Sequence, residues 1–365
     1  MGYVAVTGGR TAIENANKLV HSYRLKDAER AIEVKEIESQ MRLLVDRVMG
    51  EGGLYAPEYA ALALKQTEGD VHEAAFLLRA YRSTLPRNHY SMITDPGEMR
   101  GIRRISSSFK DIPGGQVLGP TYDYTHRLLN FDLRNESGAV EQFLEDFALE
   151  LDTEMDTPSF PKVMDLLREQ GLVANRKIDE VEPFDITREK LAFPAPRSAR
   201  LQLLSRGETG AMTALAYSSM RGYGAVHPTI GELRVGYSEV HIPYPFADEE
   251  EDSIYIGELK LTEVETVNSF TQNNQGDVEF MLGYGLTFGQ NEVKAIAMAI
   301  LERSLETQGQ SPTQDEEFVL LHIDSVEAQG FVSHLKLPHY ITFQSMLDRI
   351  RQAQKESKVE TGSKG

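Results

Sequence analysis

The stretch DVEFMLGYGLTFG, residues 277–289, carries the clearest strand pattern in this sequence. Every second residue from Val278 to Phe288 is large and apolar or aromatic, which is typical of a β-strand that presents one face to a core. Asn291 then caps a stretch with helical spacing, in which the residues predicted to face inward are Val293, Ile296, Ala297, Ile300 and Leu301. A strand followed closely by an amphipathic helix predicts a sheet that packs on helices.

Two segments before this stretch indicate further strands. ELRVGYSEVHI (232–242) and IYIGELKLTEV (254–264) alternate in part between apolar and polar residues. Together the three strands predict an α+β fold with an antiparallel sheet packed on helices. The sequence contains neither the Rossmann nor the Walker spacing for phosphate binding. Helical patterns flank the strands at 197–221 (broken at Gly207 and Gly210), 315–329 (ended by Gly330) and 342–354.

The N-terminal part has a different organisation. Residues 11–85 carry helical stripes, with Pro57 suited to the first turn of one helix and Asp70 to the N-terminus of the next. This pattern predicts a small helical bundle. We divide the chain into a helical N-terminal domain with a Gly/Pro-rich functional loop (1–130), an acidic insertion and connector (131–196), and an α+β domain that includes the C-terminal histidines (197–365).

The composition excludes several classes of protein. The chain has 365 residues, a net charge of −18 and no cysteine. The charge argues against nucleic-acid or anionic-membrane partners, because the long-range field repels both, although a local basic pocket can still bind a phosphorylated ligand. Without cysteine, disulfides and cysteine-held iron–sulfur clusters are excluded, and a metal needs His, Asp or Glu ligands. No signal-peptide pattern or membrane-spanning apolar run is present, so we expect a soluble, cytoplasmic protein.

The stretch FVSHLKLPHY, residues 331–340, places two histidines five residues apart. His334 and His339 would lie on different sides of a regular helix or strand, so they converge only if the segment bends. Pro338 favours a bend, because it disfavours helical geometry in the residue before it. Zinc sites use comparable histidine spacings, but they normally have further ligands nearby, and none is evident in this chain. The alternative is two histidines at a surface or an interface.

The stretch KDIPGGQVLGPTYDYTHRLL, residues 110–129, concentrates residues that suit a sugar and its phosphates. Gly114 and Gly115 permit positive φ, so their N–H groups can surround an anion. A carboxylate, phenols, an imidazole and a guanidinium follow within six residues, namely Tyr122, Asp123, Tyr124, His126 and Arg127. The alternative is a packed turn in which the Asp and Tyr side chains cap backbone groups.

A shorter stretch, SSMRGYGAVHP, covers residues 218–228. Arg221 precedes a Gly-x-Gly and His227 follows it, so both side chains can contact a phosphate. Most short glycine motifs of this kind are simple turns, and a turn is the alternative here.

Several blocks of this sequence, taken together, resemble the PhnI family of carbon–phosphorus lyase subunits. The resemblance covers nearly the whole chain in the same order, although the acidic insertion 131–160, the stretch PRNHYSMITDPGEMRG (86–101) and the C-terminal tail fit less well. The blocks are ALALKQTEGD (61–70), AAFLLRAYRSTL (74–85), KDIPGGQVLGPTYDYTHRLL (110–129), ALAYSSMRGYGAVHPTIGELRVGY (214–237), GYGLTFGQNEVKAIAMA (283–299) and DEEFVLLHIDSVEAQGFVSHLKLPHY (315–340).

The resemblance implies an activity in the first step of phosphonate breakdown. With partner subunits, a subunit of this family replaces the adenine of ATP by a phosphonate such as methylphosphonate, which gives α-D-ribose 1-methylphosphonate 5-triphosphate. Alone, it is expected to act as a nucleosidase that converts ATP or GTP to the free base and ribose 5-triphosphate. The expected partners are PhnG, PhnH and PhnJ, with PhnL and PhnK as accessory ATPase-like subunits.

The resemblance also implies a zinc site. His334 and His339 would bind zinc at the interface with PhnJ, and a histidine of PhnJ would complete the site. The later radical cleavage of the carbon–phosphorus bond belongs to PhnJ and its iron–sulfur cluster, and the absence of cysteine here agrees with that division of labour.

Roles in cleaving the N-glycosidic bond of Mg²⁺-bound ATP follow from residue chemistry. Asp123 is the candidate electrostatic carboxylate or base, and His126 or Tyr124 is the candidate near the adenine. Cationic side chains and backbone N–H groups are expected at the triphosphate, namely Lys110, Gly114, Gly115, Arg127 and Arg221. The alternative function is a non-catalytic scaffold subunit that supplies two histidines to an interface zinc site.

Overall fold

The structure is a computed structural model built around a four-stranded antiparallel sheet with the order β1-β2-β3-β4. The strands are β1 (Arg100–Ile105), β2 (Thr229–Pro243), β3 (Ser253–Gln272) and β4 (Val278–Phe288). All three predicted strands are present, and helices pack on the sheet, so the predicted α+β class is confirmed. The sequence pattern did not predict β1. The structure describes residues 9–148, 161–174, 176, 182–223, 228–246, 252–336 and 340–362.

A short turn joins β3 to β4 and sets their register. The side-chain Oδ1 of Asn273 accepts hydrogen bonds from the backbone N–H groups of Gln275 (2.9 Å) and Asp277 (3.0 Å). Gly276 takes a φ of 90°, which a residue with a side chain rarely adopts. From this turn the two strands pair back to Leu261 and Phe288.

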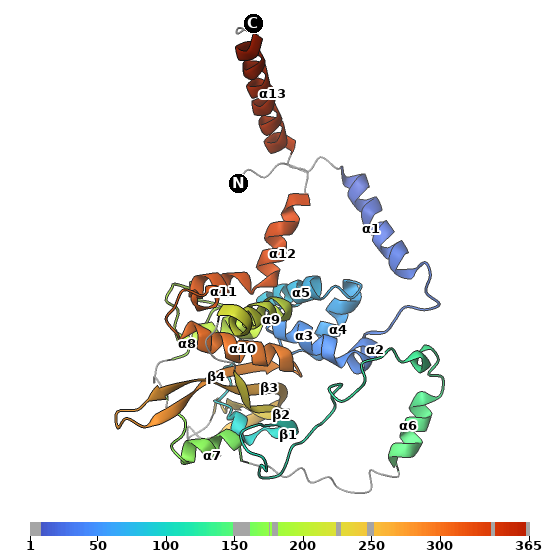
Figure 1. Cartoon of the computed structure of the whole chain (residues 1–365). Helices are drawn as coiled ribbons and strands as arrows, with labels where there is room; N and C mark the ends of the chain where they lie inside the picture. The colour runs from blue at the N-terminus through green and yellow to red at the C-terminus, as the bar shows by residue number, and fades with distance from the viewer. Residues whose placement is uncertain are drawn as a thin grey trace.

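Helix α10 (Glu292–Leu305) packs on one face of the sheet at very short range (Figure 1). A Cβ atom at Gly283 would lie 2.0 Å from the carbonyl oxygen of Ala299, and one at Gly285 would lie 2.1 Å from that of Ala295. The small residues of β4 therefore face α10, and the large residues of its alternating pattern face the other side of the sheet.

The predicted inward face of α10 needs one correction. Val293 is 57% exposed, whereas Ala297, Ile300 and Leu301 are buried as predicted. In the first turn of α10, Lys294 and not Val293 faces α3 (Arg42–Gly52). The buried Lys294 ammonium lies close to Gly50 of α3.

Helix α7 (Val163–Glu169) covers the opposite face of the sheet (Figure 1). Met164 and Leu167 of α7 form a small apolar cluster with Val173 and Leu282. Beside this cluster, β2 and β3 place charged residues under the helix, and the buried ones are Glu232, Arg234, Glu263 and Glu265.

A bundle of four short helices adjoins the sheet. They are α2 (Val34–Gln40), α3, α4 (Pro57–Gln66) and α5 (Val71–Thr84). Pro57 is in the first turn of α4, and the Asp70 carboxylate accepts from the N–H groups of His72 and Glu73, so both predicted helix starts are confirmed. Asp46 of α3 ties the bundle to the sheet, because its carboxylate contacts the Lys260 ammonium at 2.9 Å.

The second helical group packs around α10. Its helices are α8 (Arg197–Arg206), α9 (Thr209–Ser218) and α11 (Glu316–His322), while α12 (Ser325–Ser333) contacts α5 of the bundle. The predicted break at Gly207 is confirmed, but the one at Gly210 is wrong, because Gly210 lies in the first turn of α9 and its N–H donates to the capping Glu208 carboxylate. The helix predicted at 315–329 is in fact two helices, because the Asp324 carboxylate accepts from the N–H of Val326 and caps a new helix that starts at Ser325. Helix α12 continues past Gly330, which was predicted to end it.

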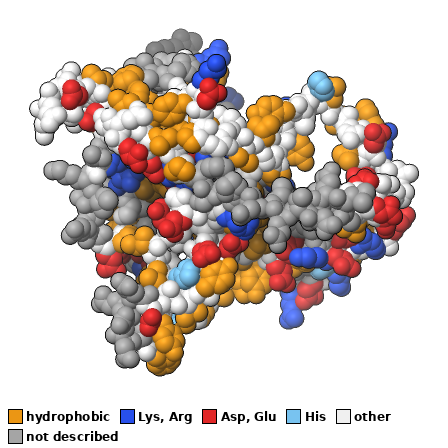
Figure 2. Space-filling view, turned by 90° about the horizontal axis from the view of Figure 1, so that it is seen from below, with side chains coloured by type: hydrophobic (Ala, Val, Ile, Leu, Met, Phe, Trp, Pro, Cys, Tyr) orange, Lys and Arg blue, Asp and Glu red, His pale blue; other side chains and the backbone are white. Residues whose placement is uncertain are grey.

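Three helices extend away from this body (Figure 1), namely α1 (Arg10–Leu25), α6 (Ala139–Ala148) and α13 (Tyr340–Gly362). None of the residues of α1 is buried, and its apolar Leu19 and Tyr23 are 58% and 67% exposed. Helix α13 is longer than the predicted 342–354, because the Lys-, Glu- and Gln-rich tail favours helix. Hydrophobic patches also lie exposed on the body (Figure 2). Within the described residues, no helix is long and apolar enough to cross a membrane.

The remaining regular elements are short. A π-helical turn follows α9, and 3-10 turns lie before β1, before α6, before α11 and after α12. Their bounds are Ser219–Tyr223 for the π turn and Pro96–Glu98, Phe131–Arg134, Pro312–Gln314 and His334–Lys336 for the 3-10 turns.

Candidate functional site

The structure brings part of the predicted loop site together. The Asp123 carboxylate contacts the Arg103 guanidinium at 2.6 Å and that of Arg127 at 3.4 Å. Arg103 is almost fully buried and also contacts Glu292 at 3.0 Å. Tyr124 and His126 are exposed beside Asp123 in sequence. The loop is therefore anchored to β1 and α10 through a buried arginine, with its aromatic side chains facing solvent.

The glycines of this loop form a turn. Gly114 and Gly115 have φ values of 76° and 70°, as their predicted conformational freedom requires. The Gly115 N–H donates to the carbonyl of Ile112 at 2.9 Å, and the Gly115 carbonyl accepts from Arg104 at 2.7 Å. Because this N–H is already used, the turn supplies fewer donors to an anion than the sequence suggested. Lys110 is exposed next to it.

The other predicted residues lie elsewhere on the chain. Arg221 is exposed in the π turn after α9 and donates to the Tyr217 hydroxyl at 2.6 Å. His334 is in the 3-10 turn after α12, where its Nδ1 donates to the carbonyl of Phe331. His339 and His227 lie outside the described residues.

A charged cavity between α7 and the sheet was not predicted. Its volume is about 450 Å³, which is within the usual range for small-molecule sites. Two carboxylates of β3, Glu263 and Glu265, lie at its floor, and both are buried. Four cationic side chains also line this Glu263 cavity, and they are Lys162, Arg168, Arg176 and Arg197.

Glu263 is bonded through both of its carboxylate oxygens. Its Oε1 accepts from the Lys162 ammonium at 2.9 Å and from the Tyr284 hydroxyl at 3.2 Å. Its Oε2 accepts from the Arg234 guanidinium at 2.6 Å. Glu265 contacts Lys162 at 3.2 Å and the guanidinium of Arg168. The two β3 carboxylates are thus held by ion pairs with cations that line the same hollow or lie beside it.

These contacts determine which groups of the cavity are charged. Burial raises the pKa of the Glu263 carboxyl, but the charges of Lys162 and Arg234 outweigh burial, so this pKa lies below its ordinary value. Burial lowers the pKa of the Lys162 ammonium, but Glu263 and Glu265 outweigh it, so that pKa lies above its ordinary value. Burial and the Glu263 charge raise the pKa of Tyr284. At neutral pH the cavity therefore holds an ionised carboxylate and a protonated phenol.

The sequence contained one signal for this cavity. TEVETV, residues 262–267, places Glu263 and Glu265 on one face of β3, with Val264 on the other. Such a Glu-x-Glu pattern normally marks a solvent-facing strand. A helix about 100 residues earlier in the chain covers it here, since Lys162 and Glu263 are 101 residues apart.

Comparison with known proteins identifies the family. The family described as "Bacterial phosphonate metabolism protein (PhnI)" matches residues 2–357. The chain belongs to the PhnI family. It is 49% identical over 360 residues to the α-D-ribose 1-methylphosphonate 5-triphosphate synthase subunit PhnI of Escherichia coli K12, with 97% of this chain and 99% of that protein covered.

Two further relatives agree with the PhnI assignment. The Rhizobium meliloti protein of the same name is 44% identical over 362 residues, with 97% of this chain and 95% of that protein covered. A Stutzerimonas stutzeri protein, HtxH, whose name describes it as a candidate C-P lyase subunit, is 51% identical over 377 residues, with 100% and 99% covered. The resemblance found in the sequence blocks is therefore confirmed.

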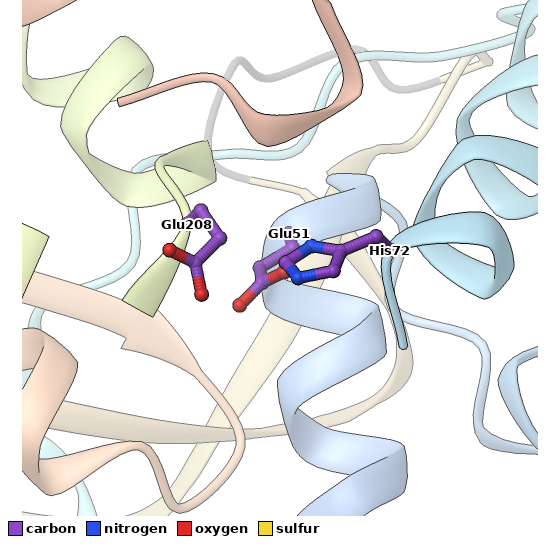
Figure 3. Close-up of side chains that lie close together, drawn as sticks. All are labelled: Glu51, His72 and Glu208. Carbon is purple, nitrogen blue, oxygen red and sulfur yellow. The ribbon is translucent and has the colours of Figure 1, made fainter. Parts of the chain in front are cut away.

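A second buried polar cluster in this PhnI-family chain joins three helices (Figure 3). It consists of Glu51 at the end of α3, His72 in α5 and Glu208 at the start of α9. One ligand atom of each residue lies within 4.8 Å of the others. The Oε2 atom of Glu51 and the Nδ1 atom of His72 are buried without a hydrogen-bond partner among the described residues.

This cluster has the residue types of a metal site but the wrong surroundings for one. Glu208 caps α9, because its two oxygens accept from the N–H groups of Gly210 (2.8 Å) and Ala211 (2.5 Å). Arg47 contacts Glu51 at 2.9 Å and Glu208 at 2.5 Å. Together with the buried Lys294 nearby, this arginine already supplies the positive charge that a divalent cation would bring. The cluster is therefore best understood as a network that holds the helices together.

Lys294 makes the stability of this network depend on pH. Burial lowers the pKa of its ammonium from 10.5 to about 8, although Glu51 acts in the opposite direction. The unfolded chain thus binds more protons than the folded chain between these two values, so the contribution of Lys294 to stability rises with pH from about 8 to 10.5.

We expect Lys294→Met to remove this rise. The unfolding free energies of wild type and variant, from urea titrations between pH 7 and 10.5, should diverge above pH 8 by up to about 1.4 kcal/mol per pH unit. Lys190→Met, at an exposed lysine, serves as the control and should follow the wild type. Parallel curves for Lys294→Met and wild type would show that Lys294 keeps its proton in the folded state.

Proposed function

We propose that this chain is a catalytic subunit of a phosphonate-degrading complex and displaces adenine from ATP by a phosphonate. The product would be α-D-ribose 1-methylphosphonate 5-triphosphate when the phosphonate is methylphosphonate. The names of the Escherichia coli and Rhizobium meliloti relatives, which describe synthase subunits for this compound, support the proposal. In the structure, the Glu263 cavity supports it, because an ionised carboxylate, Glu263, and several cations line one hollow.

The proposed step exchanges one bond at the ribose. The bond between C1′ of the ribose and N9 of adenine breaks, and its electron pair leaves with the base, which takes up a proton. A phosphonate oxygen forms the new bond to C1′. When water attacks instead, the products are adenine and ribose 5-triphosphate. The ribose develops positive charge on the way, and a buried ionised carboxylate such as Glu263 stabilises that charge.

The cations of the cavity suit the triphosphate. Lys162 and Arg168 face the β3 carboxylates, while Arg176 and Arg197 face Glu302, at 2.7 and 2.9 Å. In the proposal, phosphate oxygens draw these cations away from the carboxylates and leave the carboxylates facing the ribose. Mg²⁺ would bind with the triphosphate as part of the substrate. The loop around Asp123, with Tyr124, His126 and Arg127, is the second candidate location for this chemistry.

Zinc and partner subunits belong to the same proposal. His334 and His339 would hold zinc together with a ligand of a partner subunit. The hydrogen bond from His334 Nδ1 to a backbone carbonyl supports a ligand role, because such bonds orient metal-binding imidazoles. Apolar side chains near His334 support a partner surface, since Phe331, Val332 and Leu335 are all more than 60% exposed. The exposed apolar residues of α1 also support a surface for a partner subunit.

The first test is release of adenine by the purified chain. We expect free adenine, followed by chromatography, when the chain is incubated with ATP and Mg²⁺, with ribose 5-triphosphate as the second product. If adenine appears only after partner subunits are added, the scaffold function gains support and the active site lies at an interface. No adenine from either the chain or the assembled complex would refute the proposal.

A further inference from the structure

Three arginines meet at the end of helix α3, outside the Glu263 cavity. Arg79 and Arg82 lie one turn apart on α5, and Arg206 is the last residue of α8. They converge at Gly53, whose φ of 66° ends α3. A Cβ atom at Gly53 would lie 2.7 Å from a guanidinium nitrogen of Arg82 and 3.0 Å from the Arg206 side chain. Only a residue without a side chain allows both arginines to approach there.

The arginine cluster, defined as Arg79, Arg82 and Arg206, has fewer negative partners than positive charges. Arg79 contacts the Asp324 carboxylate at 2.6 Å and the carbonyl of Glu51 at 2.7 Å. Arg82 donates to the carbonyl of Gly53 at 3.1 Å and has no carboxylate within ion-pair distance among the described residues. One carboxylate therefore serves the first two arginines.

Arg206 has no partner among the residues that the structure describes. Across the described ranges it makes no hydrogen bond or ion pair, and its Nε atom is buried. Burial and then the charges of Arg79 and Arg82 lower the pKa of Arg206 to about 10. The carboxylates of Asp324 and Glu327 act in the opposite direction but do not balance these effects.

A purely structural role explains two of the three arginines. Arg79 and Arg82 donate to the last carbonyl groups of α3, and cations at a helix C-terminus are favourable. It does not explain Arg206, which adds a third, partly buried positive charge and has no hydrogen bond or ion pair within the described part of the chain. In a chain with a net charge of −18, this local excess of positive charge needs an anion.

We propose that the arginine cluster binds a small phosphate- or phosphonate-bearing molecule, with Arg206 and Arg82 as the principal contacts. Guanidinium groups pair with tetrahedral oxyanions through two parallel hydrogen bonds, which suits both sources. The partly exposed side chains of Arg82 and Arg206 leave an approach from solvent. The choice between a triphosphate and a phosphonate rests on the proposed function, while the requirement for an anion follows from the uncompensated charge.

The test is calorimetric titration of the full chain with inorganic triphosphate and, separately, with methylphosphonate. We expect saturable binding of at least one of them, weakened by added KCl. Arg206→Gln and Arg82→Gln should each weaken that binding at least about tenfold. Arg188→Gln, at an exposed arginine that lies 4.0 Å from Asp185, is the matched control and should bind as the wild type does.

The outcomes separate the ligand sources and the two proposals. Binding of triphosphate alone would assign the site to the nucleotide, and binding of methylphosphonate alone to the phosphonate. Absence of binding, or unchanged binding by Arg206→Gln, would overturn the inference.

Arg206→Gln should also keep the wild-type Tm, because the substitution removes a positive charge that Arg79 and Arg82 repel, so a folding defect is not expected. Triphosphate binding without any adenine release by the complex would leave this site standing while the proposed function fails.

Discussion

Glu263→Gln should lower the rate of adenine release from ATP by about 100-fold or more. The substitution keeps the shape of the side chain but removes the negative charge that is proposed to face the ribose. Burial between Lys162 and Arg234 keeps this carboxylate ionised, and charges act most strongly where water is excluded. The measurement is the initial rate of adenine formation, by the chain alone or by the complex, at saturating ATP.

The variant needs two comparisons, because it also leaves buried cations without a partner. Breaking a buried ion pair costs stability, so the folded fraction must be measured by circular dichroism at the assay temperature. Tyr284→Phe removes only the hydrogen bond to Glu263 and leaves its charge, so a smaller loss of rate is expected. Glu239→Gln, at a 67% exposed side chain of β2, should have no effect.

Asp123→Asn distinguishes the two candidate locations of the chemistry. If Asp123 is the catalytic carboxylate, this variant loses the activity and Glu263→Gln retains it when folded. If adenine release by Asp123→Asn stays within about tenfold of the wild type, which corresponds to about 1.4 kcal/mol, a catalytic role of Asp123 is excluded. A folded Glu263→Gln with wild-type rate would exclude the Glu263 cavity in the same way.

Gly285→Val should destabilise the chain by about 3 kcal/mol or more, the largest effect on folding that we expect. The new Cβ would meet the carbonyl oxygen of Ala295 at 2.1 Å. Backbone of a buried helix cannot move aside as a flexible side chain can, so α10 must shift from the sheet. The branches of valine add further overlap. Thermal unfolding should show a clear loss of Tm or insoluble protein.

The matched control is Gly101→Ala in β1. A Cβ atom at Gly101 meets nothing within 4 Å, so this variant should unfold within about 0.5 kcal/mol of the wild type. The milder Gly285→Ala should lose an intermediate amount of unfolding free energy, since its Cβ makes the same short contact but lacks the branches of valine. A Tm for Gly285→Val equal to that of wild type would show that α10 packs less closely on β4 than described.

Local patterns in the sequence were sufficient to predict much of the fold. Alternation in 277–289 and helical spacing after Asn291 predicted β4 and α10 because these patterns depend only on which face of an element is apolar. Pro57 and Asp70 marked helix starts because their effects are local. Strand β1 was missed because its buried positions carry Arg103 and Arg104, and long polar side chains hide a strand pattern.

The predicted sites depended on contacts that local patterns do not contain. The loop near Asp123 suggested a phosphate nest, yet Gly115 uses its N–H within the turn and Arg104 occupies the carbonyls. Glu263 lies in a Glu-x-Glu pattern that is typical of a solvent-facing strand, but here it is buried against the start of α7. Arg82 and Arg206 are 124 positions apart in the chain, and only packing of α5 and α8 against Gly53 brings them together.

The sequence by itself determined the α+β class, most helix and strand positions, and the PhnI family to which the chain belongs. These follow from periodicity, helix caps and the order of long sequence blocks, all of which are present before the chain folds. Only the tertiary structure decided which face of β4 meets α10, which carboxylates are buried and which arginine has no partner among the described residues. Burial and charge balance depend on elements distant in sequence, so no local pattern records them.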